Sequence, residues 1–167
     1  MLVIYLHKKS VADDLSIVKG SKEEQYTGLI PQIEGLLTGE CDLIANLANV
    51  TAALKEQFGW LWVGFYIVKQ DELVLGPFQG PVACRRIKRG RGVCGKSWQL
   101  AKPLIVPDVE KFPGHIACSS LSKSEIVIPV IRNNEVVAVL DVDSEKYDFF
   151  DQTDEQYLEQ IAGMINF

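Results

Sequence analysis

Two segments near the start of the chain place apolar residues at helical spacing. Residues 23–37 and 42–58 each repeat an apolar side chain every three or four positions, which is typical of an amphipathic helix. Pro31 lies inside the first segment, so we expect a break or kink there. Gly59 directly follows the second segment and predicts where that helix ends.

After Gly59, the spacing of apolar residues changes from the helical pattern to one in which successive side chains fall on opposite faces of a strand. This predicts a strand whose one face carries Trp60, Trp62, Gly64 and Tyr66. Gln70-Asp71 and Asn133-Asn134 are turn sequences between apolar runs, so each predicts a hairpin. In all, strands are expected at 60–68, 72–78, 84–87, 104–106, 125–131 and 135–143.

Two further helices are expected, one at about 93–100 and one at the C-terminal end. The C-terminal helix should begin near Thr153, because Thr153-x-x-Gln156 resembles a capping box. Between the strands, residues 108–124 predict a long loop, and loops of that length in compact domains are usually functional or mobile.

The order of these elements indicates an α+β fold. Hairpins at both ends of the strand region favour a central antiparallel sheet of about six strands, with helices packed on one face. The other face, with its long loops, would be free to hold a ligand. Residues 1–22 carry no clear period and are expected to form an N-terminal extension, whereas 23–167 are expected to form one domain.

The charge balance mainly excludes classes of binding partner. The 167 residues include 17 basic and 22 acidic side chains, a net charge of −5, and no basic stripe that would favour nucleic acid. The basic run at 85–91 is expected to be a solvated loop. The apolar run at 2–6 is too short to span a membrane and follows no cationic segment. We therefore expect a cytoplasmic protein with neither a nucleic-acid nor a membrane partner.

Cysteines supply the first candidate chemistry, because a thiolate is a nucleophile that needs no cofactor. Cys118 is the strongest candidate, since it lies in the long loop where an exposed thiol is easily placed. Cys94 could have a lowered pKa at a helix start, but close packing explains it equally well. Cys41 is expected to be structural or incidental. Pairing of Cys84 with Cys118 stays open, because sequence carries no geometry.

Carboxylates and aromatic rings supply the second candidate feature, a binding pocket. Asp141 and Asp143 are two residues apart on one expected strand, so they share a face and lie roughly 6–7 Å apart. Trp62 and Tyr66 share a face by the same rule. If both faces line one concavity, the pocket would suit a small zwitterion with an apolar tail. The alternative is that both aspartates lie in water at a fraying strand end.

A metal site is the competing use of the same residues. Four potential ligands lie between residues 84 and 118: Cys84, Cys94, His115 and Cys118. Their spacing does not resemble a zinc knuckle or ribbon, so we expect no metal. The Gly90-x-Gly92-x-x-Gly95 string lacks the preceding strand and the acidic residue of a dinucleotide site, so no nucleotide cofactor is expected.

Ordered motifs run from about residue 25 to the end of the chain. They are Gly64-Phe65-Tyr66, Leu75-Gly76-Pro77-Phe78-Gln79-Gly80, Ala83-Cys84, Gly90-Arg91-Gly92-Val93-Cys94-Gly95, His115-Ile116-Ala117-Cys118, Ser124-Glu125-Ile126-Val127 and Leu140-Asp141-Val142-Asp143-Ser144. Together they resemble the free methionine-(R)-sulfoxide reductases, enzymes built on a single GAF domain. The resemblance implies the GAF architecture and a free amino acid as substrate.

The resemblance also implies roles for individual residues. Cys118 matches the catalytic thiol, Cys84 its disulfide partner, and Cys94 a third cysteine variously assigned as an additional resolving thiol. The matched substrate-binding residues are the aromatic Trp62 and Tyr66 and the acidic Glu125, Asp141 and Asp143. The implied reductant is a thioredoxin-type dithiol, and no cofactor is needed.

Two other function classes stay open beside the reductase. One is a sensory GAF domain that binds a small molecule and reports occupancy to a partner. The other is a redox sensor whose Cys84–Cys118 disulfide changes shape without turnover. Residues 1–22 are expected to serve as a disordered tail, a lid or a dimer contact, which leaves a homodimer open.

Overall fold

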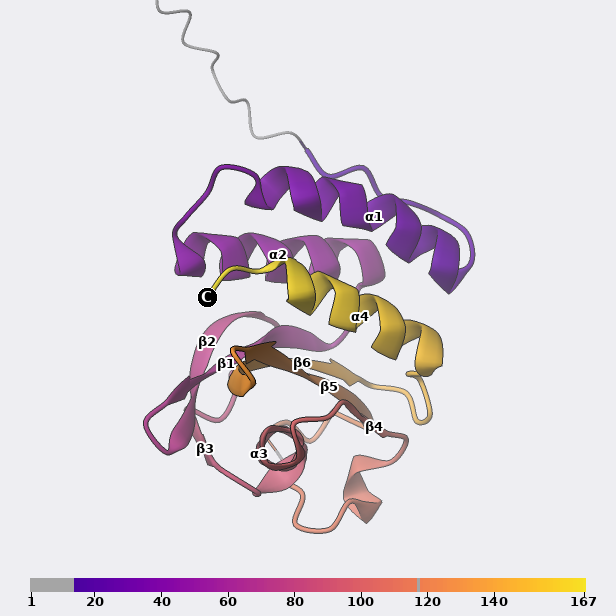
Figure 1. Ribbon diagram of the computed structural model, residues 1–167. Coiled ribbons are helices and arrows are strands. Elements are labelled where there is room, and N and C mark those ends of the chain that lie inside the picture. Colours follow the sequence, from indigo (N-terminus) through magenta and orange to yellow (C-terminus); the bar gives the residue numbers. More distant parts are fainter. Residues whose placement is uncertain (1–13, 117) are drawn as a thin grey trace, which may run out of the picture.

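A six-stranded antiparallel sheet runs through the centre of the protein, in the order β3-β2-β1-β6-β5-β4 (Figure 1). The computed structural model describes residues 14–116 and 118–167. The strands are β1 (Trp62–Lys69), β2 (Glu72–Gln79), β3 (Arg86–Lys88), β4 (Leu104–Val106), β5 (Ser124–Arg132) and β6 (Glu135–Ser144). The predicted α+β class and the six-stranded sheet are confirmed.

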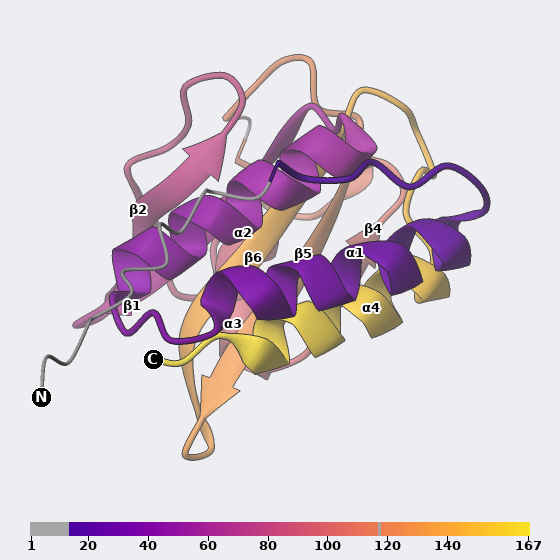
Figure 2. The same ribbon diagram turned by 90° about the horizontal axis from the view of Figure 1, so that it is seen from above.

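Three helices cover one face of this sheet. They are α1 (Lys22–Leu37), α2 (Leu43–Phe58) and α4 (Gln152–Met164). α2 and α4 lie on the strands, and α1 lies across both from outside (Figures 1 and 2). Their apolar stripes and the inward residues of β1, β5 and β6 form the larger hydrophobic core, which includes Leu29, Leu54, Phe65, Leu140 and Leu158.

The opposite face carries the short helix α3 (Gly92–Leu100), the turn η1 (Val109–Lys111) and the loops (Figure 1). A second apolar cluster lies under α3 and includes Trp62, Tyr66, Cys94 and Trp98. The predicted helix layer on one face is therefore accompanied by one helix on the other. This face is where a pocket forms.

Three local expectations are wrong. α1 continues through Pro31 without a break. Pro31 has no N–H to donate to the Thr27 carbonyl, but both residues are exposed, so water can take the place of that donor. Trp60 precedes β1 and packs in the helix-side core rather than beside Trp62. The cap of α4 is Asp151, whose side chain accepts bonds from backbone N–H groups of the first turn.

The described part of the predicted N-terminal extension runs along the helix layer. Val18 exchanges two hydrogen bonds with the Gln57 side chain, at 2.9 and 2.7 Å, and Leu15 packs against the core. The boundary between extension and domain stays a prediction, and the apolar run at 2–6 lies outside the described residues. Within residues 14–116 and 118–167, no helix combines the length and apolarity needed to cross a membrane.

Candidate active site

The register of three central strands gathers polar side chains into one row. Trp62 on β1 lies opposite Asp143 on β6, and Asp143 lies opposite Glu125 on β5. Asp141, two residues before Asp143, lies opposite Gly64. Side chains two positions apart share a face, so these residues all point to the side of the sheet that carries α3.

An aromatic wall borders this row. The Trp62 ring stacks between Phe78 and Tyr66, with ring centroids 5.4 and 5.9 Å away. Its Nε1 donates a hydrogen bond to the Pro81 carbonyl oxygen at 3.1 Å. Gly64 makes room for the stack, since a Cβ there would lie 2.4 Å from the Phe78 Cβ and 2.6 Å from the Trp62 ring. The wall is therefore fixed in orientation.

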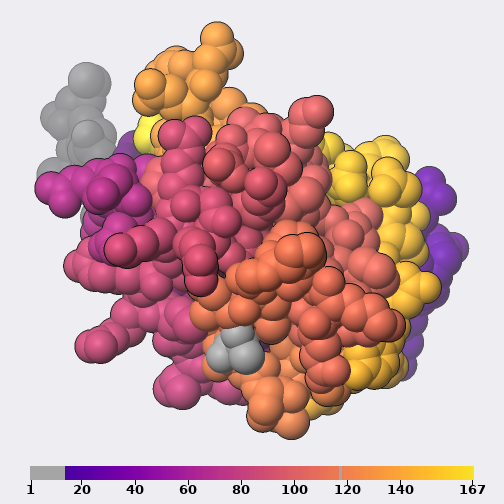
Figure 3. Space-filling model, turned by 90° about the horizontal axis from the view of Figure 1, so that it is seen from below, coloured from indigo at the N-terminus to yellow at the C-terminus, as the bar shows by residue number. Residues whose placement is uncertain are grey.

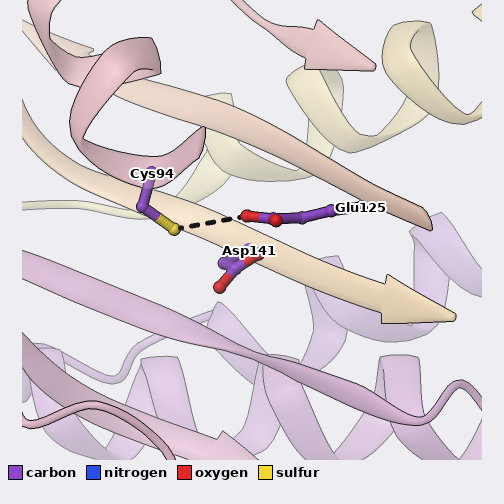
Figure 4. A group of neighbouring side chains, drawn as sticks. All are labelled: Cys94, Glu125 and Asp141. Carbon is purple, nitrogen blue, oxygen red and sulfur yellow. Dashed lines mark hydrogen bonds between the residues drawn. The ribbon is translucent and has the colours of Figure 1, made fainter. Parts of the chain in front are cut away.

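Two buried acids and a thiol form the floor of the site. Glu125 and Asp141 are each 6% exposed, and Cys94 on α3 is 3% exposed. Cys94 Sγ donates to Glu125 Oε1 at 3.7 Å, and the three side chains point toward one another from α3, β5 and β6 (Figure 4). Asp141 Oδ1 has no hydrogen-bond partner among the described residues, so one acceptor atom is left for a ligand or a shared proton.

The acids differ in how strongly they hold a proton. Burial, aided by the neighbouring aspartates, raises the pKa of Glu125 well above its usual range. Burial and Asp143 do the same to the pKa of Asp141. The pKa of Asp143 rises only to about 6, because a hydrogen bond donated by the Ser122 hydroxyl opposes the effect of burial. Glu125 and Asp141 therefore keep a proton to higher pH than an ordinary carboxyl group does, and the hydrogen bond from Ser122 favours the ionised form of Asp143.

The surrounding acids also affect the Cys94 thiol. Burial, Asp141 and Glu125 all raise its pKa, so Cys94 is a thiol at neutral pH. A helix start does not lower its pKa here, because burial and two acids have the larger effect. Its helix is held close to the sheet by Gly95, whose added Cβ would lie 2.4 Å from the Lys88 carbonyl oxygen.

Cys84 and Cys118 form a disulfide beside the site, and Cys118 lines the pocket. Cys84, between β2 and β3, is bonded to Cys118, 34 residues later in the loop after η1. Their Cα atoms are 5.5 Å apart, within the ordinary range for such a bond. In Figure 3, which views the face opposite the helix layer, the orange loop after η1 borders the magenta β2–β3 segment.

These groups surround one pocket. Its lining combines apolar walls with the acids and one sulfur of the disulfide, namely Trp62, Tyr66, Ile116, Cys118, Glu125, Asp141 and Asp143. Such a mixture of aromatic wall and convergent polar groups is typical of a small-molecule site. The only free thiols in the described chain are Cys94, in this floor, and the exposed Cys41 near the start of α2.

Comparisons with known proteins agree with this geometry. Residues 42–166 match the GAF domain family. The chain is 43% identical to free methionine-R-sulfoxide reductase of Escherichia coli, over 87% of this chain and 88% of that protein. The chain belongs to the free methionine-R-sulfoxide reductase family.

Other relatives are closer in sequence. GAF domain-containing protein A of Dictyostelium discoideum is 68% identical, over 93% of this chain and 99% of that protein. The crystal structure of free methionine-R-sulfoxide reductase from Neisseria meningitidis, in complex with its substrate, is 51% identical. It superposes with a TM-score of 0.89, over 90% of this chain and 92% of that chain.

Each site residue expected from the family resemblance lies in or beside this one pocket. Cys118 lines the pocket, whereas Cys84 is bonded to Cys118 but is not part of the lining. The alternative of aspartates frayed into water is wrong, because Asp141 is buried and Asp143 is hydrogen-bonded to Ser122. The roles of these residues remain predictions.

While the disulfide is present, the four metal ligands considered from the sequence cannot act together. The disulfide consumes the thiolates of Cys84 and Cys118. In the described chain, ligand atoms of Cys94, Glu125 and Asp141 lie within 4.8 Å of one another, close enough to surround an ion. Cys94 is hydrogen-bonded to Glu125, and the raised pKa of each of the three groups favours a bound proton over a bound metal ion. We assign no metal there.

Sequence reasoning missed two groups of this reductase-family pocket. Phe78 completes the aromatic stack on Trp62. It lies in the Leu75–Gly80 motif, which suggested no role for this ring. Ser122 bonds to Asp143 across 21 positions. No periodic signal marks Ser122, because it lies in the loop just before β5.

Proposed function

We propose that this chain reduces free L-methionine-(R)-sulfoxide to methionine with its own thiols, and that a thioredoxin-type dithiol restores those thiols. One observation carries the proposal. A cysteine already paired with a second cysteine opens onto an aromatic pocket floored by buried acids, and burial raises the pKa of Glu125 and Asp141. The substrate is a zwitterion with a methyl sulfoxide tail, and it matches this pocket in charge and polarity.

The rings and the acids would bind different parts of the substrate. We place the methyl-sulfur end against the Trp62 and Tyr66 rings, since sulfur and methyl groups pack favourably on aromatic faces. The ammonium would be received by a carboxylate, and the sulfoxide oxygen by an acid that carries a proton. Glu125 and Asp141 fit the second role, because burial raises the pKa of each.

Reduction then takes two steps on the protein. The Cys118 thiolate attacks the sulfoxide sulfur while a protonated carboxyl gives its proton to the oxygen. The attack forms a transient bond between Cys118 Sγ and the substrate sulfur. The hydroxyl then passes from the substrate sulfur to Cys118 Sγ as that bond and the original S–O bond break, so methionine leaves and Cys118 carries the oxygen as a sulfenic acid. The Cys84 thiol then attacks this sulfenic sulfur, which releases water and forms the Cys84–Cys118 disulfide. A dithiol reductant exchanges with the disulfide and returns both thiols.

Cys94 is assigned a different part. Its raised pKa favours the thiol, which is a poor nucleophile. Its hydrogen bond to Glu125 instead supports the floor of the pocket. We therefore assign attack to Cys118 and resolution to Cys84.

The test is an assay that couples NADPH oxidation to turnover through thioredoxin and its reductase. With racemic free methionine sulfoxide, the wild-type chain should consume NADPH until about half of the substrate is gone. Cys118→Ser should abolish turnover. Cys84→Ser should release roughly one methionine per chain and then stall, because the sulfenic acid lacks its resolving thiol.

The matched control is Cys41→Ser, which removes an exposed cysteine near the start of α2 and should leave the rate unchanged. Sustained turnover by Cys118→Ser would contradict the mechanism. A sensory or redox-sensing domain would consume no NADPH in proportion to the R epimer. A peptide containing methionine sulfoxide should be a poor substrate, since its sulfoxide lacks the free ammonium.

A further inference from the structure

The three pocket acids differ in what the protein supplies to each. Glu125 accepts a hydrogen bond from the Cys94 thiol, and Asp141 Oδ1 has no partner among the described residues. Asp143 alone accepts a hydroxyl hydrogen bond, from Ser122. A hydroxyl donor favours the charged form of the carboxyl that accepts from it, so the protein treats one acid differently from the other two.

Ser122 is held firmly in place. It is 6% exposed, and the residue after it is anchored on two sides. The Lys123 N–H donates to the Ser144 carbonyl oxygen at 2.8 Å, and the Lys123 carbonyl accepts from Val109 N–H at 3.0 Å. The Ser124 hydroxyl donates to the Lys146 carbonyl at 2.7 Å. The Ser122 hydroxyl therefore points at Asp143 from a backbone that is fixed next to β6.

Among the described residues, the pocket lining offers Asp143 no lysine or arginine. The other titratable groups of the pocket are Glu125 on β5, Asp141 on β6, Cys94 on α3, Tyr66 on β1 and His115 in the loop after η1. The first four are either neutral or negative, and burial lowers the pKa of His115, which favours its uncharged form. A carboxylate in such surroundings attracts a cationic group from the ligand.

We propose that Ser122 is a positioning residue, whose hydroxyl orients the Asp143 carboxylate and keeps it in the anionic form that receives the ammonium of the substrate. This inference rests on the proposed function, because it assumes an amino-acid substrate. The proposal assigns different roles to the three acids. Asp143 recognises the amino acid, while Glu125 and Asp141 supply the proton to the sulfoxide oxygen.

Kinetics of Ser122→Ala test the assignment. Loss of a hydrogen bond to a charged group should raise KM for free methionine-(R)-sulfoxide about tenfold, with kcat changed less than about threefold. Ser122→Thr keeps the hydroxyl and should restore most of the affinity. Ser120→Ala, an exposed serine of the same loop, is the matched control and should behave as the wild type.

A substrate without the ammonium separates positioning from general damage. The R enantiomer of 4-(methylsulfinyl)butanoate is methionine-(R)-sulfoxide without its amino group. Ser122→Ala and the wild type should have KM values for it within about twofold of each other, because Asp143 has no ammonium to receive. An equal defect on both substrates would overturn the proposal, as would unchanged kinetics or failure of Ser122→Thr to rescue.

The pH profile gives an independent readout. In the wild type, kcat/KM should fall on the acid side as Asp143 becomes protonated, near its pKa of about 6. Without the hydroxyl the pKa of Asp143 rises further, so this fall should move to higher pH in Ser122→Ala. The defect of the variant should therefore be larger at pH 6 than at pH 8, and an identical profile would contradict the proposal.

Binding measured without turnover distinguishes a failure of the reductase assignment from a failure of the proposed role of Ser122. Calorimetry on Cys118→Ser, with and without Ser122→Ala, reports affinity for methionine sulfoxide directly. If the wild type shows no turnover but affinity falls about tenfold with Ser122→Ala, the reductase assignment fails and the positioning role stands. If turnover is normal and affinity is unchanged, the positioning role fails alone.

Discussion

At the residue scale, the pocket acids are kept at a cost in stability. Asp141 is buried, and burial raises its pKa far above the usual value of an aspartate. The folded chain therefore binds more protons than the unfolded chain between about pH 4 and the folded pKa. Stability falls as pH rises through that window. A group that suits proton donation thus opposes folding at neutral pH.

Asp141→Asn should accordingly stabilise the protein at pH 8 and abolish reductase activity. The amide removes the titration, so we expect a gain of about 1 kcal/mol or more in the free energy of unfolding, a rise of about 2–4 °C in Tm for a chain of this size. Urea unfolding at pH 4, 6 and 8 measures it.

The sign of the effect is checked by its pH dependence. At pH 4 the wild-type carboxyl already carries its proton in the folded state, so the advantage of Asp141→Asn should disappear there. Glu135→Gln, at an exposed position, should show no comparable pH-dependent gain. A stabilisation that is equal at pH 4 and pH 8 would contradict a raised pKa for Asp141.

At the element scale, α3 depends on how closely its backbone approaches β3. Gly95 lies against the Lys88 carbonyl oxygen, and its own carbonyl accepts a 2.7 Å hydrogen bond from Gly90 N–H. Both contacts involve backbone, so neither can move aside like the end of a flexible side chain. This approach places Cys94, the preceding residue, over the acids.

Gly95→Ala should therefore cost about 1–3 kcal/mol of stability, because the methyl group overpacks the interface. It should also expose Cys94, which is buried in the native protein. Unfolding curves and the rate of Cys94 modification by a thiol reagent, in a Cys41→Ser background, measure the two effects.

Gly35→Ala is the matched control on α1. A Cβ at Gly35 meets nothing within 4 Å, and alanine is the better helix former, so the change should be neutral or stabilising by about 0.5–1 kcal/mol. If Gly95→Ala proved equally harmless and left Cys94 protected, the close contact between α3 and β3 would have no structural importance.

At the scale of the whole molecule, the disulfide joins two loops that the sheet alone does not connect. Cys84 and Cys118 are 34 residues apart, and a cross-link over such a span restricts the unfolded chain. The same bond closes one side of the pocket, since Cys118 is part of its lining. Thiol chemistry and global stability are therefore coupled.

Reduction of the oxidised protein should lower its free energy of unfolding by about 2–4 kcal/mol. Thermal melts with and without a reducing agent measure the difference. Cys84→Ser should melt like the reduced wild type under both conditions, because it cannot form the bond. A melting temperature of the wild type that ignores the reductant would contradict the coupling.

The sequence by itself determined the elements and pointed to most of the polar and aromatic residues that line the pocket. Periodicity predicted the strands and hairpins, since alternation follows directly from strand geometry. It placed Asp141 beside Asp143 and Trp62 beside Tyr66 on shared faces, and both pairs line the pocket. It misjudged Pro31 and Trp60, whose outcomes depend on solvent exposure and on where β1 begins.

Only the tertiary structure decided how those residues differ chemically. Protonation depends on burial and on neighbours brought from other strands, and neither is written in local spacing. The contact of Ser122 with Asp143, the approach of Cys94 to Glu125 and the pairing of Cys84 with Cys118 join positions 21 to 34 residues apart. Such contacts exist only once the sheet has set its register.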